Sequence, residues 1–248
     1  VSGAAERDFE GGYRINVDAS RTLFEKIRKA HLTDGYAPKV IFASSLAVYG
    51  APLPDPVPDH QIRTPQSSYG IQKAIVELLI DDYTRRGFFD GIGLRLPTIV
   101  IRPGAPNAAA SGFFSGILRE PLAGQTTTLP VGRDVKHWLA SPRAAVGFLV
   151  HAAGLNSADI GPHRTMTMPG VETTVEGQIA ALTRAAGPEA AALITDEPNR
   201  EIEAIIETWP RAFEPHRALS LGFTAENSVD DLITVYLEDD APQKHTPH

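Results

Sequence analysis

Two apolar runs, each preceded by a long amphipathic segment, limit this chain to one fold class. Residues 8–32 and the stretch from Ser67 to about residue 86 have the apolar spacing of helices, and Ser67 is typical of a helix N-cap. Residues 39–44 and 92–101 are apolar without alternation, as strands in a parallel sheet covered on both faces would be. The order helix, strand, helix, strand therefore predicts an α/β fold with crossover connections.

The second half of the chain differs from the first. After residue 104 the elements become shorter, and proline and charged residues interrupt them. Helices are predicted near 111–122, 142–155, 174–186 and 228–238, and strands near 126–131 and 164–168. We therefore predict that residues 1–103 belong to the sheet domain and that 104–248 form a smaller, mixed α/β substrate lobe. Parts of about 135–170 are expected to return to the sheet domain.

Composition excludes several kinds of function. The 248 residues carry a net charge of −7 and no cluster of lysine or arginine, which argues against a nucleic-acid partner. No apolar run approaches the roughly 20 residues that a membrane-spanning helix needs, and the first residues do not resemble an export signal. Without cysteine there is no disulfide, and we expect no metal site. These features are compatible with a cytoplasmic protein that binds small molecules.

Three side chains near the ends of the first strand and the second helix can carry chemistry. Ser45 follows the apolar run 40–43, at the carboxyl end of the strand, where open α/β sheets bind ligands. Tyr69 and Lys73 are four residues apart, which places them on one face of a helix. A nearby ammonium favours a phenolate, and a base tuned in this way can take a proton from an alcohol. The three residues therefore predict oxidation of a secondary hydroxyl, with a cofactor accepting the hydride.

Each of these motifs alone also has a purely structural interpretation. A Tyr-x-x-x-Lys pair occurs by chance in many helices, and Ser44 with Ser45 could simply cap or turn the chain. Their order is more specific, because a buried strand, the serine pair, a proline-rich loop at 51–65 and a capped helix follow one another. This combination favours the catalytic interpretation of Ser45, Tyr69 and Lys73.

The stretch from Ser45 to Lys73 resembles the extended short-chain dehydrogenase/reductase family, which contains nucleotide-sugar epimerases and dehydratases. The resemblance implies a Rossmann-type, doubly wound parallel sheet that binds NAD, with NADP as the open alternative. It implies that Ser45 orients the substrate and that Tyr69, in contact with substrate and cofactor, is the general acid/base. Lys73 is expected to contact both the phenol and the nicotinamide ribose.

Two further positions match the family. Pro97, Thr98 and Ile99 follow a predicted strand, where family members contact the nicotinamide carboxamide. A proline that merely ends a strand is the other interpretation of this site. Asn16 matches a family asparagine on the preceding helix, although it could equally tie a strand end to that helix.

The chain departs from the family at its beginning. Family members start with a strand, a glycine-rich turn and a helix, which bring the backbone close to a pyrophosphate. Here Gly11 and Gly12 lie inside the first predicted helix, and no such motif precedes it. We expect that roughly 75–90 residues, about one mononucleotide-binding half, precede Val1 in the natural protein.

A second set of motifs resembles the members of this family that act on acid sugars. They are residues 1–6, 67–73, 94–98, 102–107, 113–117, 119–122 and 137–143. Nucleotide-sugar epimerases usually carry an Arg-Asp-Tyr run where this chain has Lys136-His137-Trp138, and Arg143 follows nearby. A guanidinium suits a small carboxylate, so Arg143 is a candidate substrate ligand, with a structural ion pair as the equal alternative. The predicted substrate is a small sugar acid, a four-carbon aldonate, whose hydroxyl at C2 is oxidised.

Two other functions stay open at this point. A nucleotide-sugar epimerase or dehydratase of the same family would act on a sugar nucleotide and return the hydride. A non-catalytic NAD(P)-binding sensor would use the fold without turnover, although the intact set of Ser45, Tyr69 and Lys73 argues against it. The two long helices are compatible with a homodimer.

Overall fold

The computed structural model describes residues 3–104 and 110–240. These residues form two compact units. The first unit is Val1–Pro97, Val146–Pro169 and Thr208–Thr224; the second is Thr98–Ala145, Gly170–Glu207 and Ala225–His248. The chain leaves the first unit after Pro97 and later returns to it twice. The boundary predicted from the sequence lay between residues 103 and 104.

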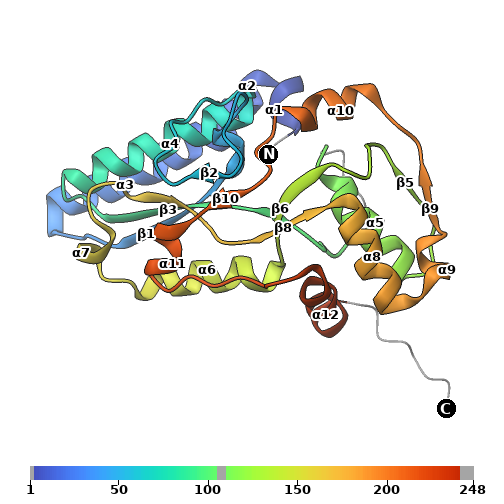
Figure 1. Cartoon of the computed structure of the whole chain (residues 1–248). Coiled ribbons are helices and arrows are strands. Elements are labelled where there is room, and N and C mark those ends of the chain that lie inside the picture. The colour runs from blue at the N-terminus through green and yellow to red at the C-terminus, as the bar shows by residue number, and fades with distance from the viewer. Residues whose placement is uncertain (1–2, 105–109, 241–248) are drawn as a thin grey trace, which may run out of the picture. The chain divides into compact units, whose positions relative to one another are not determined.

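A parallel sheet lies at the centre of the first unit (Figure 1). Its strands are β1 (Lys39–Ser45), β3 (Asp90–Leu96) and β7 (Thr165–Thr167), in the order β1-β3-β7. Ser45 pairs with Leu96 and Arg95 with Thr167, so these residues share the carboxyl end of the sheet. The predicted α/β fold with parallel strands is confirmed.

Two long helical runs lie side by side over one face of this sheet (Figure 1). The first consists of α2 (Phe9–Tyr13), a π-helical turn η1 (Arg14–Asp18) and α3 (Ala19–Asp34), which together match the predicted helix; a short α1 (Gly3–Arg7) precedes it. The second is α4 (Ser68–Arg85), which Ser67 caps as predicted: the Gly70 amide donates to the Ser67 hydroxyl at 3.1 Å. The core between helices and sheet consists of Phe24, Ile27, Val76, Ile80 and Phe89.

Helix α4 presents a different face to the core from the one that its apolar spacing predicts. Ile71 and Leu78 belong to that predicted apolar stripe, yet they are 40% and 55% exposed. Gln72, Val76 and Glu77 are fully buried instead. The prediction was wrong because it assumed that only apolar side chains turn inward, whereas polar groups that find hydrogen-bond partners can be buried as well.

Pro97 divides the predicted strand 92–101. The residues before it form β3 in the sheet of the first unit, whereas Thr98–Ile99 form β4 in another sheet. A proline has no N–H to donate to a ladder, so a strand tends to end there. The single predicted strand is therefore corrected to two short strands in different sheets.

The second unit is built on a mixed sheet of order β4-β6-β8, with β6 (Lys136–Ala140) parallel to β4 and antiparallel to β8 (Val171–Thr174). A second pair joins β5 (Thr127–Leu129) to β9 (Ile194–Asp196). The helices of this unit are α5 (Gly112–Leu122), α8 (Val175–Ala186), α9 (Pro188–Ala191), α10 (Arg200–Glu207) and α12 (Val229–Asp239). Helix α6 (Pro142–Gly154) begins in this unit and continues into the first.

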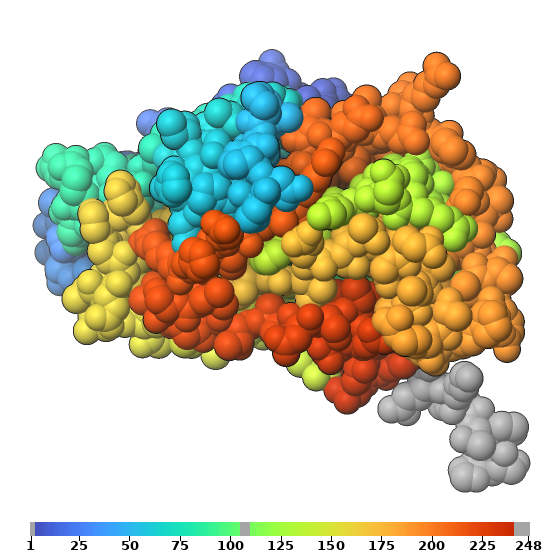
Figure 2. Space-filling view, in the orientation of Figure 1, coloured from blue at the N-terminus to red at the C-terminus, as the bar shows by residue number. Residues whose placement is uncertain are grey.

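The proline-rich loop at 51–65 lies against the returning segment 208–220 of the first unit, as Figure 2 shows in cyan and orange-red. The short strands β2 (Val57–Pro58) and β10 (Phe213–Glu214) pair there. At the start of α11 (His216–Ser220), the Arg217 amide donates to the Asp59 carboxylate of the loop at 2.7 Å. The loop is therefore ordered by backbone pairing, as the sequence predicted for an ordered surface loop.

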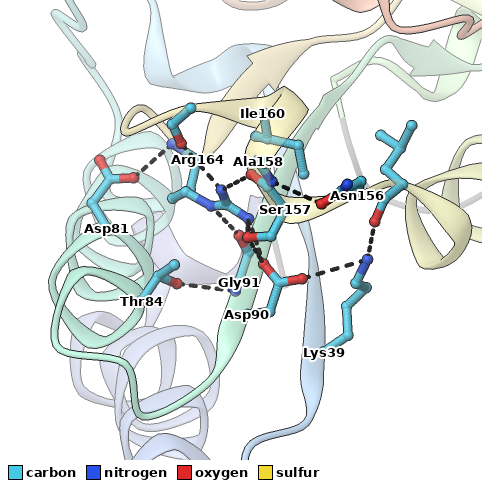
Figure 3. Close-up of polar contacts among 12 residues, drawn as sticks. Lys39, Asp81, Thr84, Asp90, Gly91, Asn156, Ser157, Ala158, Ile160 and Arg164 are labelled. Carbon is cyan, nitrogen blue, oxygen red and sulfur yellow. Dashed lines mark hydrogen bonds and ion pairs between the residues drawn. The ribbon is translucent and has the colours of Figure 1, made fainter.

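The amino end of the parallel sheet is closed by Arg164 (Figure 3). Its guanidinium donates to the Gly91 carbonyl at 2.7 Å and to carbonyls at the two ends of α7 (Ser157–Ile160). It also pairs with Asp90, which Lys39 approaches at 3.4 Å on the other side. This network fixes the loop before β7 to the start of β1 and β3.

Within the described ranges, none of the helices combines the length and the apolar character that crossing a membrane requires.

Candidate active site

Ser45 stands where β1 ends and the chain turns. It is the N-cap of a short 3-10 turn, η2 (Leu46–Val48), and its hydroxyl accepts a hydrogen bond from the Ala47 amide at 3.2 Å. A serine in this position satisfies a backbone donor that the turn would otherwise leave unpaired. The same contact holds the hydroxyl at the carboxyl end of the sheet, where α/β folds bind their ligands.

Tyr69 lies in the first turn of α4, and Gly70 lets that turn approach the end of β1. A Cβ atom on Gly70 would stand 2.0 Å from the Ala47 carbonyl oxygen, so only glycine allows this contact. The helix start and the turn after Ser45 are therefore in direct backbone contact. This close approach is what brings the tyrosine to the serine.

The Ser45 hydroxyl lies close enough to the Tyr69 phenol to affect the pKa of that phenol. Burial raises the pKa of the Tyr69 phenol above its ordinary value, and the hydrogen bond with Ser45 opposes that rise. A raised pKa favours the protonated phenol at neutral pH. Proton abstraction requires further positive charge next to Tyr69.

Lys73 lies one turn after Tyr69 on α4. Its ammonium donates to the Ala43 carbonyl of β1 at 2.8 Å, and it stands 4.6 Å from the Phe42 ring centroid and 5.6 Å from that of Tyr69. Burial lowers the pKa of Lys73, whereas the negative charge of Glu77 raises it. The ammonium is thus anchored to the strand and close to the tyrosine ring.

The donor set of this site fits a nicotinamide ribose. An ammonium has three N–H donors, and the Ala43 carbonyl accepts one from Lys73, which leaves donors for ribose hydroxyls. The phenol of Tyr69 offers both a donor and an acceptor. The chemistry of Tyr69 and Lys73 is therefore compatible with the NAD predicted from the sequence.

The predicted cofactor contacts at Pro97, Thr98 and Ile99 lie where the chain changes sheets. Pro97 is buried, and Thr98 and Ile99 pair with β6 as strand β4. The Thr98 hydroxyl lies 2.6 Å from His137 Nε2. The strand-ending interpretation of this proline is observed, and its contact with a cofactor stays a prediction.

Arg143 lies in the first turn of α6 on the surface of the second unit. Its guanidinium donates to both carboxylate oxygens of Asp239 at 2.8 and 2.6 Å and to Glu238 at 2.8 Å. The side chain is 47% exposed. These contacts match the structural ion pair that the sequence left open, and the substrate role of Arg143 stays a prediction.

Sequence reasoning missed a polar cluster directly behind the site. It comprises Ser44, Arg63, Glu77 and Arg95, whose contacts are described below. The signal available in the sequence was the spacing of Glu77, four residues after Lys73 and therefore on the same side of the helix. Asn16, singled out from the sequence, donates to Gln72 at 2.7 Å and so joins η1 to the neighbour of Lys73 on α4.

The fold and this site agree with the relationships that the chain shows to known proteins. The NAD dependent epimerase/dehydratase family matches residues 2–149, and the chain belongs to that family. It is 51% identical to a D-erythronate dehydrogenase of Cupriavidus necator and 42% identical to a D-erythronate dehydrogenase of Haemophilus influenzae. These similarities cover 96% and 97% of this chain and 72% and 75% of the two relatives.

A solved structure is also closely similar. The crystal structure described as the nucleoside-diphosphate-sugar epimerase from Agrobacterium tumefaciens has 59% sequence identity and a TM-score of 0.94 with this chain. The similarity covers 96% of this chain and 70% of that one. The resemblance to the extended short-chain dehydrogenase/reductase family is therefore confirmed, and the protein is an NAD-dependent dehydrogenase of the epimerase/dehydratase type.

Proposed function

We propose that the protein oxidises D-erythronate to 2-dehydro-D-erythronate with NAD as the hydride acceptor. The observation that supports this most strongly is the close backbone approach of the first turn of α4 to the turn that Ser45 caps, which places Tyr69 and Lys73 at the carboxyl end of β1. The two curated relatives, which are named for this activity, support the choice of substrate.

The chain's own residues divide the work of the reaction. Ser45 binds and orients the hydroxyl at C2, and Tyr69 takes the proton of that hydroxyl as the C–O bond becomes a carbonyl. When bound, NAD supplies the hydride acceptor and a positively charged ring that favours the phenolate of Tyr69. Lys73 adds a second positive charge and would hold the ribose through the N–H donors that do not bond the Ala43 carbonyl. The substrate thus loses its hydroxyl proton to Tyr69, and the hydrogen on C2 would leave as a hydride to the bound cofactor.

The decisive test removes the phenolic oxygen. In the natural full-length protein, we expect Tyr69→Phe to lower NADH production from D-erythronate by about 10²- to 10⁴-fold, the size of a general acid/base contribution. The thermal unfolding temperature should stay close to that of the wild type. Tyr36→Phe is the matched control, because Tyr36 is 54% exposed and lies outside the site. Turnover that survives in Tyr69→Phe would remove this tyrosine from the mechanism.

A nucleotide-sugar epimerase is the second candidate function, and the description of the Agrobacterium tumefaciens structure favours it. An epimerase returns the hydride to the sugar, so it changes a sugar nucleotide without accumulating NADH. A dehydrogenase accumulates NADH in proportion to the acid that it consumes. Parallel assays with D-erythronate and with UDP-sugars therefore separate the two functions by the presence or absence of net NADH.

Several finer expectations from the sequence accompany this proposal. NAD rather than NADP, a cytoplasmic location and an additional cofactor-binding half before Val1 stay predictions. The homodimer also stays a prediction, to which the exposed apolar side chains of α3 and α4 add support: Leu23 is 53% exposed, Ile71 40% and Leu78 55%. The sensor alternative would require that neither acid sugars nor sugar nucleotides are turned over.

A further inference from the structure

Glu77 is a fully buried carboxylate that the proposed reaction does not use. It lies on α4 one turn after Lys73, and its exposed fraction is 0%. Placing a charge in a protein interior is costly unless the charge is paired and its hydrogen-bonding capacity is satisfied. A carboxylate at this position therefore requires specific partners.

Those partners come from three separate segments of the first unit. One oxygen of Glu77 accepts from the Ser44 hydroxyl at 2.5 Å and from Arg95 Nε at 3.0 Å. The other accepts from an Arg95 terminal nitrogen at 2.8 Å and from Arg63 at 2.9 Å. We call these four residues, Ser44, Arg63, Glu77 and Arg95, the Glu77 clamp. It ties α4 to β1, to β3 and to the proline-rich loop.

The clamp meets the proposed active site on both of its sides. On the strand side, Ser44 directly precedes Ser45, and Arg95 also donates to the Tyr49 hydroxyl at 2.6 Å, just after the turn that Ser45 caps. On the helix side, Glu77 is four residues from Lys73. The clamp thus connects the backbone that carries the serine to the helix that carries the base and the lysine.

We propose that Glu77 is a positioning residue: through the clamp it fixes α4 against the end of β1, and it places a negative charge one helical turn from the Lys73 ammonium. This inference rests on the proposed function, since Lys73 matters here as the partner of the phenol and of the cofactor. Arg95 and Arg63 keep the Glu77 carboxylate in place but, being cations, they act on Lys73 in the opposite direction.

The charged groups around Lys73 make this effect testable. On its own helix it faces Tyr69 and Glu77, and β1 offers it the Ala43 carbonyl and the Phe42 ring. From β3 and the loop, the cations Arg95 and Arg63 bond to Glu77 and partly offset its negative charge.

The polar groups of the other segments packed on α4 have partners other than Lys73. Glu6 of α1 accepts from Ser68, and Asn16 of η1 bonds Gln72. Glu25 of α3 pairs with Arg28 of the same helix and accepts a hydrogen bond from Tyr83, ten residues after Lys73 on α4. The carboxylate that acts on Lys73 is therefore that of Glu77.

Two substitutions of opposite charge effect provide the test. Glu77→Gln removes a negative charge and should lower the pH at which Lys73 loses its proton. Arg63→Gln removes a positive charge and should raise it. Arg63 is 26% exposed and lines a pocket of about 620 Å³, so a glutamine should be accommodated there without unfolding the protein.

The measurement is the affinity of the natural full-length protein for NADH as a function of pH, followed by NADH fluorescence. Affinity should fall at alkaline pH as Lys73 loses the proton that serves the ribose. The midpoint of this fall should move by about one pH unit to lower pH in Glu77→Gln, and by a smaller amount to higher pH in Arg63→Gln. The alkaline limb of kcat/KM should move in the same directions.

Ser44→Ala controls for geometry without a change of charge. It removes one hydrogen bond from the clamp, so the midpoint of NADH binding should stay at the wild-type pH. The value of kcat should fall severalfold, because Ser45 is held less firmly. Displacement of the midpoint in Ser44→Ala, equal to that in Glu77→Gln, would show that distortion and not charge moves it, and would overturn the proposal.

The decisive negative result is an alkaline midpoint that is the same in wild type and Arg63→Gln. Because Arg63→Gln is expected to fold, this outcome overturns the charge effect even if Glu77→Gln does not fold. NADH binding also separates the two proposals. A wild-type protein that binds NADH but does not oxidise D-erythronate contradicts the proposed function, whereas opposite midpoint shifts in the two variants would still support the clamp.

Discussion

The two ends of the parallel sheet each bury an arginine next to a carboxylate, yet the two arginines are held differently. At the carboxyl end, Arg95 forms two hydrogen bonds to Glu77, and although burial lowers its pKa, the bonds and charge of Glu77 raise the pKa above its ordinary value. At the amino end, Arg164 donates largely to backbone carbonyls, and burial lowers its pKa despite Asp90 and Asp81.

This difference separates two uses of a buried charge. Arg164 donates to backbone carbonyls in the segment before β7, so we expect it to contribute to stability alone (Figure 3). Arg95 holds a carboxylate whose other contacts reach Ser44 and the helix of Tyr69. We therefore expect substitutions at the amino end to change stability alone, and substitutions at the carboxyl end to change catalysis as well.

The largest effect on stability should come from Arg164→Met. It leaves the carbonyls of Gly91, Ser157 and Gly161 without this donor, and Asp90 without its closest cation. We expect the free energy of unfolding to fall by about 3 kcal/mol, measured by urea denaturation. The kcat of the remaining folded protein and its alkaline NADH midpoint should equal those of the wild type.

Arg184→Met is the matched control for this change. Arg184 is 58% exposed and pairs with Asp230, which is 47% exposed, so the same substitution there should lower the free energy of unfolding much less. If Arg164→Met shifted the NADH midpoint as Glu77→Gln does, the distinction between the two ends of the sheet would be lost.

Gly70→Ala tests the carboxyl end through the backbone. The added methyl group would lie 2.0 Å from the Ala47 carbonyl oxygen, so α4 must move away from the turn that Ser45 caps. We expect a loss of about 1–3 kcal/mol in stability and a fall in kcat of about 10²-fold, because Tyr69 moves with the helix. Unfolding and initial-rate measurements on the same preparation check both effects.

Gly116→Ala is the control for the glycine. Gly116 lies inside α5, and the nearest atoms to an added Cβ there are 3.6 Å away. Alanine in an uncrowded helix position is neutral or slightly stabilising. A full wild-type kcat in Gly70→Ala would mean that the close approach of α4 and η2 does not place the tyrosine.

Much of the carboxyl end was predictable from the sequence, because local rules determine it. The apolar run before Ser45 and the Ser67 cap predicted β1 and the start of α4 within one residue. The spacing of Tyr69 and Lys73 followed from helix geometry alone. What local rules could not supply was the rotation of α4, since its buried face is chosen partly by Glu77, whose partners come from β1, β3 and the loop.

The second unit was less predictable for a related reason. Strands β6 and β8 are short, and their pairing with each other and with β4 involves residues far apart in the chain. Neither a charged residue at the start of β6 nor a glutamate in β8 resembles the apolar run of a buried strand. The partner in the ion pair of Arg143 was unpredictable for the same reason, because Asp239 lies 96 residues away.

Lys39→Met should have the smallest effect on the free energy of unfolding, and it tests the amino end of the sheet alone. Lys39 pairs with Asp90 at 3.4 Å, donates to the Leu155 carbonyl, and is 26% exposed, so its removal should cost about 1 kcal/mol. The difference from wild type should shrink as salt rises, since a partly exposed ion pair is screened. Lys136→Met, whose pair with Glu172 is 44–45% exposed, should cost less. A change in kcat in Lys39→Met would connect the amino end of β1 to catalysis and contradict the division of roles between the two ends.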